Sequence, residues 1–335
     1  MVVSPGGPYR NGYPPYYAVA YEEHRRIRGT ANGVCWTVLI GILLMFALSD
    51  VCMGYLRIAG YRPSPDAFGG IPPVLYYLLV SVEYSVGLAL PAFLYFAFRR
   101  MPLAEGLPFR KTGAADVVLF VSFGCMVCML ANYPANLVSA IQESFGFGGS
   151  LPEMPLNDDP RVLVLYAVNV VVIPPLVEEI LFRGVALQSL RKYGDGFAVL
   201  VSAVLFGLYH GNFIQMVFAF LCGLAMGFVV IRTGSLLPSI LVHFVNNSIS
   251  LAIEMVSRYS GQAAANETNN ILSVAVIALG AVSTAVLAAR GKLFAGRRGS
   301  VLPLSSRMRA AFGNPGAVFL ALYAFGSSLY TLYRS

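Results

Sequence analysis

The feature of this sequence that most constrains its fold is a series of long apolar runs that follow one another along most of the chain. An α-helix of about 20 apolar residues is long enough to cross the hydrocarbon core of a bilayer. Inside lipid, only helices and closed barrels satisfy all of their own backbone polar groups. Runs of this length favour helices, so the sequence predicts an all-α protein, a polytopic transmembrane helical bundle.

The composition excludes a large water-soluble domain. Of the 335 residues, 57% are hydrophobic and 12% are charged, whereas about 25% charged residues is usual in a soluble chain. The formal net charge is +7, but the basic residues are spread over short segments between the apolar runs. Without a long basic tract, we expect the lipid bilayer to be the partner surface and expect no nucleic acid.

The apolar runs predict eight spans and a weaker ninth. Residues 1–32 precede them. This segment begins rich in Pro, Gly and Tyr and ends in a charged stretch, which predicts a disordered, charged cytoplasmic tail. The spans are expected at residues 35–56, 73–97, 116–141, 161–190, 196–212, 214–231, 235–257, 270–289 and, for the ninth, 316–332.

The distribution of basic residues predicts the orientation. With a cytoplasmic N-terminus and alternating spans, 17 basic residues fall in inside segments and 5 fall outside, while Arg183 lies within a span. Lys and Arg gather in cytoplasmic loops of membrane proteins. We therefore expect an integral, multi-pass protein whose N-terminus is cytoplasmic.

Charged side chains in the fourth expected span are candidates for function, because an ionisable group at bilayer depth is costly. Glu178 and Glu179 are adjacent there, and the preceding Pro174-Pro175 is expected to kink the helix or to open a local cavity just before them. Glu179 and Arg183 are four residues apart, so they share a helical face and can pair. Glu178 lies about 100° further round the helix and remains the freer carboxylate, as a general base requires.

Two further spans carry polar residues at a matching depth. Phe206 and His210 share a face of the fifth expected span, and His243 and Asn247 share a face of the seventh. At 1.5 Å per residue, the polar groups of this set and Glu178 lie about 12–21 Å from the cytoplasmic ends of their spans. We expect the three helices to bring these groups together, with Phe206 as a wall of the site.

A non-catalytic interpretation uses the same residues. A buried histidine can serve only as a hydrogen-bonding group, and a Glu–Arg pair can hold helices together. A transporter or scaffold can also use buried Glu and His as a proton or cation relay. The sequence shows no inverted repeat or paired discontinuous helices that would support transport, so the combination favours an enzyme.

The three patterns resemble, in order and spacing, the motifs of a known family, the CAAX-processing and bacteriocin-processing (CPBP, or Abi) intramembrane proteases. The residues that carry the resemblance are Glu178-Glu179-x-x-x-Arg183, Phe206-x-x-x-His210 and His243-x-x-x-Asn247. It covers about residues 160–255. We therefore expect a catalytic core at 160–257 between N-terminal transmembrane helices at 33–142 and C-terminal ones at 270–335.

The resemblance implies a hydrolase that cleaves a peptide bond within the membrane, a CPBP-type intramembrane glutamic endopeptidase. It implies catalytic roles for Glu178, His210, His243 and Asn247, and supporting roles for Glu179, Arg183 and Phe206. The implied substrate is a membrane-associated protein or peptide: a prenylated CAAX tail, a bacteriocin-like peptide or a membrane-anchored regulator. The family type implies a bacterial cell membrane.

Two mechanisms fit these residues. In the glutamate form, Glu178 with His210 deprotonates a water molecule, while His243 with Asn247 stabilises the oxyanion. In the metal form, His210, His243 and Glu178 hold a zinc ion that activates the water. The usual helical zinc signature of two His around a Glu is absent. We therefore expect no cofactor, with zinc as the alternative.

Overall fold

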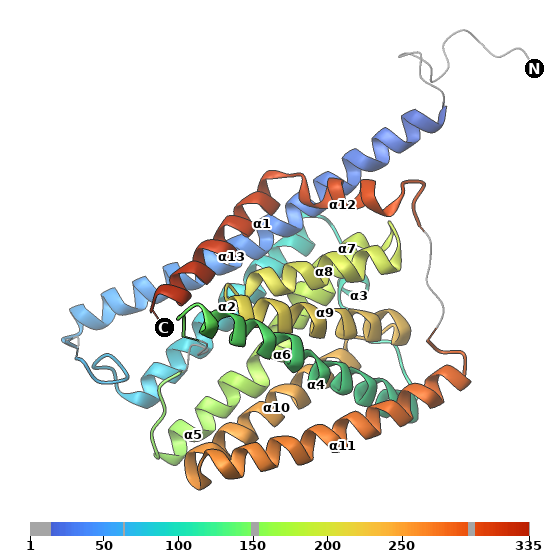
Figure 1. The fold of residues 1–335 in the computed structure, drawn as a ribbon. Coiled ribbons are helices and arrows are strands. Elements are labelled where there is room, and N and C mark those ends of the chain that lie inside the picture. Colours follow the sequence, from blue (N-terminus) through green and yellow to red (C-terminus); the bar gives the residue numbers. More distant parts are fainter. Residues whose placement is uncertain (1–14, 63, 149–153, 294–298, 335) are drawn as a thin grey trace, which may run out of the picture.

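The computed structural model describes residues 15–62, 64–148, 154–293 and 299–334. This part of the chain is almost entirely helical (Figure 1). Its one pairing of the strand type is an isolated bridge between Phe109 and Ser235. Eight helices in the described residues are long and apolar enough to cross a membrane. The prediction of an all-α polytopic bundle is confirmed.

Most long helices coincide with the expected spans. They are α1 (Pro15–Ile58), α2 (Pro73–Phe98), α4 (Ala114–Ser144), α9 (Phe213–Thr233), α10 (Leu237–Ser260), α11 (Gln262–Ala289) and α13 (Pro315–Arg334). The fourth span is a continuous stack of α5 (Pro160–Ala167), η1 (Val168–Val172), α6 (Ile173–Glu179), η2 (Ile180–Leu187) and α7 (Gln188–Arg191). Shorter helices are α3 (Leu103–Gly106), α8 (Asp195–Tyr209) and α12 (Leu304–Phe312).

Helix α1 corrects the prediction of a disordered tail over residues 1–32. It begins at Pro15 and continues through the charged stretch into the first span. The stretch is rich in Glu, Arg and Ala, which favour helix, and Ile27 and Ala31 are buried on its inner face where α1 packs against α12. Helix α12 provides a partner that the hydropathy pattern did not predict. Residues 1–14 lie outside the described residues.

Helix α13 is the ninth expected span, and it is long and apolar enough to cross a membrane. It lies beside α1 and runs in the same direction (Figure 1). The backbone N–H of Gly316 donates to Asn32 Oδ1 at 2.9 Å, and the rings of Trp36 and Phe319 have centroids 5.6 Å apart. The last helix is therefore packed onto the first.

The fifth expected span is shorter than predicted. Helix α8 has 15 residues, about 22 Å of helix, and it ends at Tyr209 instead of residue 212. Gly211 has a φ of +57°, a left-handed conformation that glycine adopts without steric cost. Asn212 then accepts backbone N–H bonds at the start of α9, as an N-cap residue does. His210 consequently lies in the α8–α9 turn.

The fourth span departs from regular α-helix at η1 and η2, which are π-helical. Pro174 and Pro175 lack backbone N–H groups, so the hydrogen-bond pattern before them cannot be completed as an α-helix. Single π-helical turns occur frequently at functional sites. Here η1 precedes Glu178 and η2 contains Arg183.

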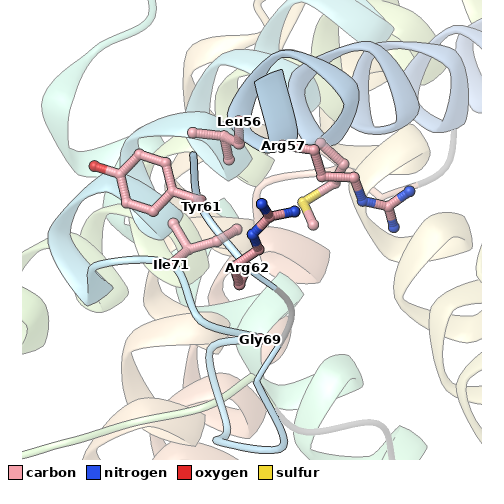
Figure 2. A pocket seen from close by; sticks show the side chains of 7 residues that line it. Leu56, Arg57, Tyr61, Arg62, Gly69 and Ile71 are labelled. Carbon is pink, nitrogen blue, oxygen red and sulfur yellow. The ribbon is translucent and has the colours of Figure 1, made fainter. Parts of the chain in front are cut away.

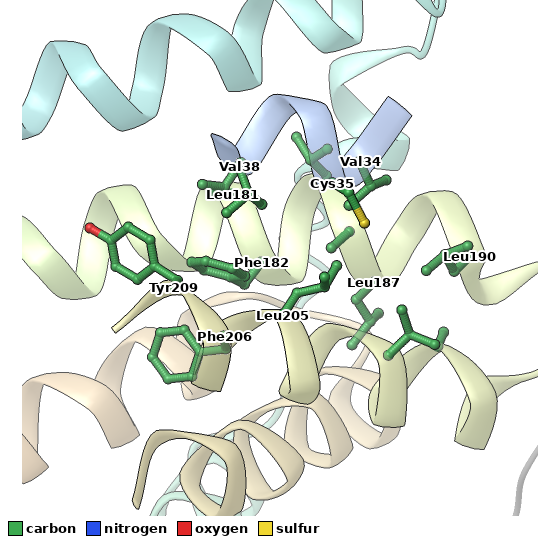
Figure 3. Packing of buried hydrophobic residues seen from close by; sticks show 14 of the residues in the cluster. Val34, Cys35, Val38, Leu181, Phe182, Leu187, Leu190, Leu205, Phe206 and Tyr209 are labelled. Atoms are coloured by element: carbon green, nitrogen blue, oxygen red, sulfur yellow. The ribbon is translucent and has the colours of Figure 1, made fainter. Parts of the chain in front are cut away.

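The main hydrophobic core surrounds η2. Leu181 and Leu187 of η2 face Val34 and Val38 of α1 and Leu205 of α8, and all five are buried (Figure 3). Tight packing of this kind fixes the rotation and depth of the helix. The core thus fixes the position of the part of the fourth span that carries the candidate site residues Glu179 and Arg183.

Candidate active site

The structure brings the three motifs together where the fourth span, α8 and α10 meet. Glu178 Oε2 lies 3.7 Å from His243 Nε2. The ring centroid of Phe206 lies 4.9 Å from that of His210 and 5.9 Å from that of His243. Phe206 therefore contacts both histidines, as expected for a residue that walls the site.

Glu179 and Arg183 form the expected ion pair, and both side chains are fully buried. Arg183 Nη1 lies 2.8 Å from Glu179 Oε1, although the two groups are not aligned as a hydrogen bond. The Arg183 guanidinium also lies over the Phe206 ring, 4.3 Å from its centroid. Ser239 donates a hydrogen bond to Glu179 Oε2. The negative charge of Glu179 is therefore neutralised by Arg183.

Glu178 is also buried, with 3% of its surface exposed, but it has no arginine partner among the described residues. Its Oε1 accepts a hydrogen bond from the Tyr84 hydroxyl. Its Oε2 has no hydrogen-bond partner within the described part of the chain. The 3.7 Å to His243 Nε2 is too long for a direct hydrogen bond. Glu178 is thus less committed to protein partners than Glu179, which agrees with the freer carboxylate that the spacing predicts.

The contacts of the two histidines define how each can act. His210 Nδ1 lies 2.7 Å from the carbonyl oxygen of Phe206. Because a carbonyl can only accept, Nδ1 carries the proton and Nε2 of the neutral ring keeps its lone pair. His243 lies between the carboxylates, with Nδ1 3.5 Å from Glu179 Oε1 and Nε2 facing Glu178. His210 can accept a proton, while His243 can present an N–H toward the free oxygen of Glu178.

Asn247 contacts the fourth span at η1, eight residues before Glu178. Its Nδ2 donates to the carbonyl of Val170 at 2.9 Å. Its Oδ1 accepts from Asn246 Nδ2 at 3.2 Å. Asn247 therefore links α10 to the fourth span by a different contact from the one that the family resemblance implies.

Sequence reasoning missed three hydroxyl groups of the site. Tyr209 donates to the Tyr84 hydroxyl at 3.1 Å, and Tyr84 in turn donates to Glu178. Ser239 could have been predicted, because it lies four residues before His243 and so shares its helical face. Tyr84 comes from α2, and no pattern in that apolar helix distinguishes it from other tyrosines.

Within the described residues, no three side chains of His, Cys, Asp or Glu are grouped so that they could hold a metal ion. The atoms that a zinc ion would use are Nε2 of His210, Nε2 of His243 and Oε2 of Glu178. Of these, His243 Nε2 and Glu178 Oε2 are 3.7 Å apart. The zinc mechanism stays a prediction.

A surface pocket occurs at the end of α1 (Figure 2). It shares no residue with the three motifs. Its lining residues are Met53, Leu56, Arg57, Tyr61, Arg62, Gly69 and Ile71. The pocket therefore contributes nothing to the contacts around Glu178.

The fold and these contacts define a class: a multi-pass helical membrane protein with buried Glu, Arg, His and Asn side chains at the junction of three helices. Residues 160–249 match the family model of type II CAAX prenyl endopeptidase Rce1-like proteins. This segment begins with α5, ends within α10 and includes all three motifs, so the resemblance to the CAAX protease family is confirmed for this segment. No curated protein and no solved structure matches the chain.

Proposed function

We propose that this protein is an intramembrane endopeptidase that hydrolyses a peptide bond with a water molecule activated by Glu178. The observation that carries the proposal is the unequal environment of the two glutamates. Glu179 is neutralised by Arg183, while Glu178 keeps one oxygen without a hydrogen-bond partner in the described part of the chain, facing His243. A carboxylate in this state can accept a proton from water.

The reaction follows from the groups around that oxygen. Glu178, with Nε2 of His210, takes a proton from the water as its oxygen attacks the carbonyl carbon of the scissile bond. His243 donates an N–H to the oxyanion that forms. The proton held by Glu178 then passes to the leaving amine, and the peptide bond breaks. The reaction needs no metal ion, with zinc held by the histidines and Glu178 as the alternative.

The other motif residues support these groups. Arg183 balances the charge of Glu179, so Glu179 can lie 3.5 Å from Nδ1 of His243 without leaving an unpaired charge in the core. Phe206 contacts both histidines and limits their rotation. For Asn247, the family resemblance implies a role at the oxyanion beside His243, although one of its two N–H groups is bound to Val170.

The proposed substrate is the C-terminal tail of a prenylated CAAX protein, because the matching family model describes CAAX prenyl endopeptidases. A prenyl group on the Cys of such a tail anchors it to the bilayer, where a membrane-embedded protease meets it. A bacteriocin-like peptide and a membrane-anchored regulator are the alternatives. We further propose a bacterial cell membrane and a cytoplasmic N-terminus, which the distribution of basic residues supports.

The proposal is tested with the purified full-length protein in proteoliposomes and a farnesylated peptide that ends in a CAAX sequence. Mass spectrometry should detect release of the last three residues, and the unprenylated peptide is the matched control. No product from the farnesylated peptide would reject the CAAX substrate. A proton flux that depends on Glu178, without cleavage of any membrane peptide offered, would favour the relay over the protease.

A further inference from the structure

Three polar side chains on one face of α10 contact the fourth span. Ser239, His243 and Asn247 follow one another at intervals of four residues, which places them on the same side of the helix. Ser239 and His243 meet the two glutamates. The Nδ2 of Asn247 instead donates to the carbonyl of Val170 at 2.9 Å.

The carbonyl of Val170 has an unusual position in its helix. In an α-helix it would accept from the N–H of residue 174, and in a π-helix from the N–H of residue 175. Both residues are proline, which has no N–H. The π pattern is present just before them, since the N–H of Ile173 donates to Val168. The helix therefore offers the Val170 carbonyl a donor in neither pattern, and Asn247 supplies one from α10.

The surroundings of the bond between Asn247 and Val170 explain why it forms and how the Asn247 amide is oriented. An unsatisfied carbonyl at membrane depth is costly, because lipid offers no hydrogen-bond donor. Asn246 Nδ2 donates to Asn247 Oδ1 at 3.2 Å, which orients the amide so that Nδ2 faces Val170. The bond joins the helical stack that carries Glu178 to the helix that carries His243.

We propose that Asn247 is a positioning residue, which holds the Glu178 segment in register with His243 through the carbonyl left free by the proline pair. The inference rests on the proposed function and refines it. It assigns Asn247 a role through Val170 in place of the oxyanion contact that the family resemblance implies. Because Glu178 and His243 are 3.7 Å apart across this junction, a small shift of the two helices separates them.

The removal of the amide should impair the chemical step more than binding. A misplacement of about 1 Å in an active site costs about 10²-fold in rate, so Asn247→Ala should lower kcat for the farnesylated CAAX peptide by about that factor. The KM should change little, because Asn247 does not bind substrate in this proposal. The Tm in detergent should fall by a few degrees, because the Val170 carbonyl loses its donor.

Rescue by a backbone donor distinguishes positioning from oxyanion binding. Pro174→Ala restores an N–H at the α-helical position for Val170, so Asn247→Ala combined with Pro174→Ala should recover most of the lost kcat and Tm. An oxyanion donor is worth about 10²–10³-fold in kcat, and a backbone N–H at residue 174 cannot replace it. Loss of activity in Asn247→Ala that the double variant does not relieve would overturn the proposal.

Two controls keep the outcome interpretable. Pro174→Ala alone should have nearly wild-type kcat. If the first double variant does not fold, Asn247→Ala combined with Pro175→Ala offers the same test, because it restores the N–H that a π-helix would supply to Val170. If the wild-type protein cleaves no membrane peptide, the proposed function fails. The Tm values of the same variants still test the bond. An unchanged Tm in Asn247→Ala, or a drop that neither proline variant restores, would overturn the inference independently of activity.

Discussion

Glu179→Gln is expected to destabilise the protein strongly, with the activity of each folded molecule falling less than in Glu178→Gln. Glu179 and Arg183 are both fully buried, and their charged atoms are 2.8 Å apart. Removal of one partner from a buried ion pair costs about 3–5 kcal/mol, because the other charge stays behind without compensation. Arg183 keeps its contact with the Phe206 ring, worth about 0.5–2 kcal/mol, so the lower end of the range is expected.

This cost corresponds to a fall in Tm on the order of 5 °C for a chain of this length, measured by thermal unfolding in detergent. Ser239→Ala is the matched control, because it removes a hydrogen bond from the same carboxylate but leaves the ion pair with Arg183 intact. A hydrogen bond to a charged group is worth about 1.5–3 kcal/mol, so this variant should lose less stability than Glu179→Gln. The double change Glu179→Gln with Arg183→Met removes both charges and should regain part of the lost stability. If Glu179→Gln unfolds at the wild-type temperature, or the double variant is less stable still, the structural role of the pair is refuted.

Three further experiments test other parts of the structure. Tyr84→Phe removes the hydroxyl that donates to Glu178 and should lower kcat about tenfold or more. Tyr209→Phe leaves that bond intact and should have a smaller effect; equal losses in steady-state kinetics would contradict a direct contribution of Tyr84. Treatment with 1,10-phenanthroline and metal-free dialysis should leave peptide cleavage unchanged, whereas a loss that Zn²⁺ reverses would establish the zinc mechanism. In a protein without native cysteines, a membrane-impermeant maleimide added to intact cells should label Ser64→Cys but not Ser300→Cys, and the opposite pattern would overturn the proposed orientation.

The helical architecture could be predicted because hydropathy and length determine it directly. Runs of about 20 apolar residues have few alternatives to a spanning helix, and the long helices end close to the expected residues, whereas α1 and α11 begin well before them. The pairing of Glu179 with Arg183 could also be predicted, since four-residue spacing puts both on one face of the helix. The motif order then pointed to the family that residues 160–249 match.

Other features depend on tertiary contacts that leave no periodic signal. The π-helical turns around Pro174 and Pro175 follow from missing N–H groups, but the sequence alone does not show which pattern replaces the α-helix. Tyr84 reaches Glu178 from a helix outside the matched segment. Helix α1, which includes residues 15–32, packs against α12, and this contact was not predicted. Such contacts appear only when helices far apart in sequence are packed together.

The rate of peptide cleavage by purified Glu178→Gln tests the proposed function most directly. The amide has nearly the shape of the carboxylate, its oxygen can still accept from Tyr84, and the intrahelical ion pair of Glu179 with Arg183 is kept, so the Tm should stay close to the wild-type value. Cleavage of the farnesylated CAAX peptide should fall by about 10²–10⁴-fold, as expected for loss of a general base. A folded Glu178→Gln protein that cleaves this peptide at the wild-type rate would contradict the assignment of Glu178 as the catalytic base.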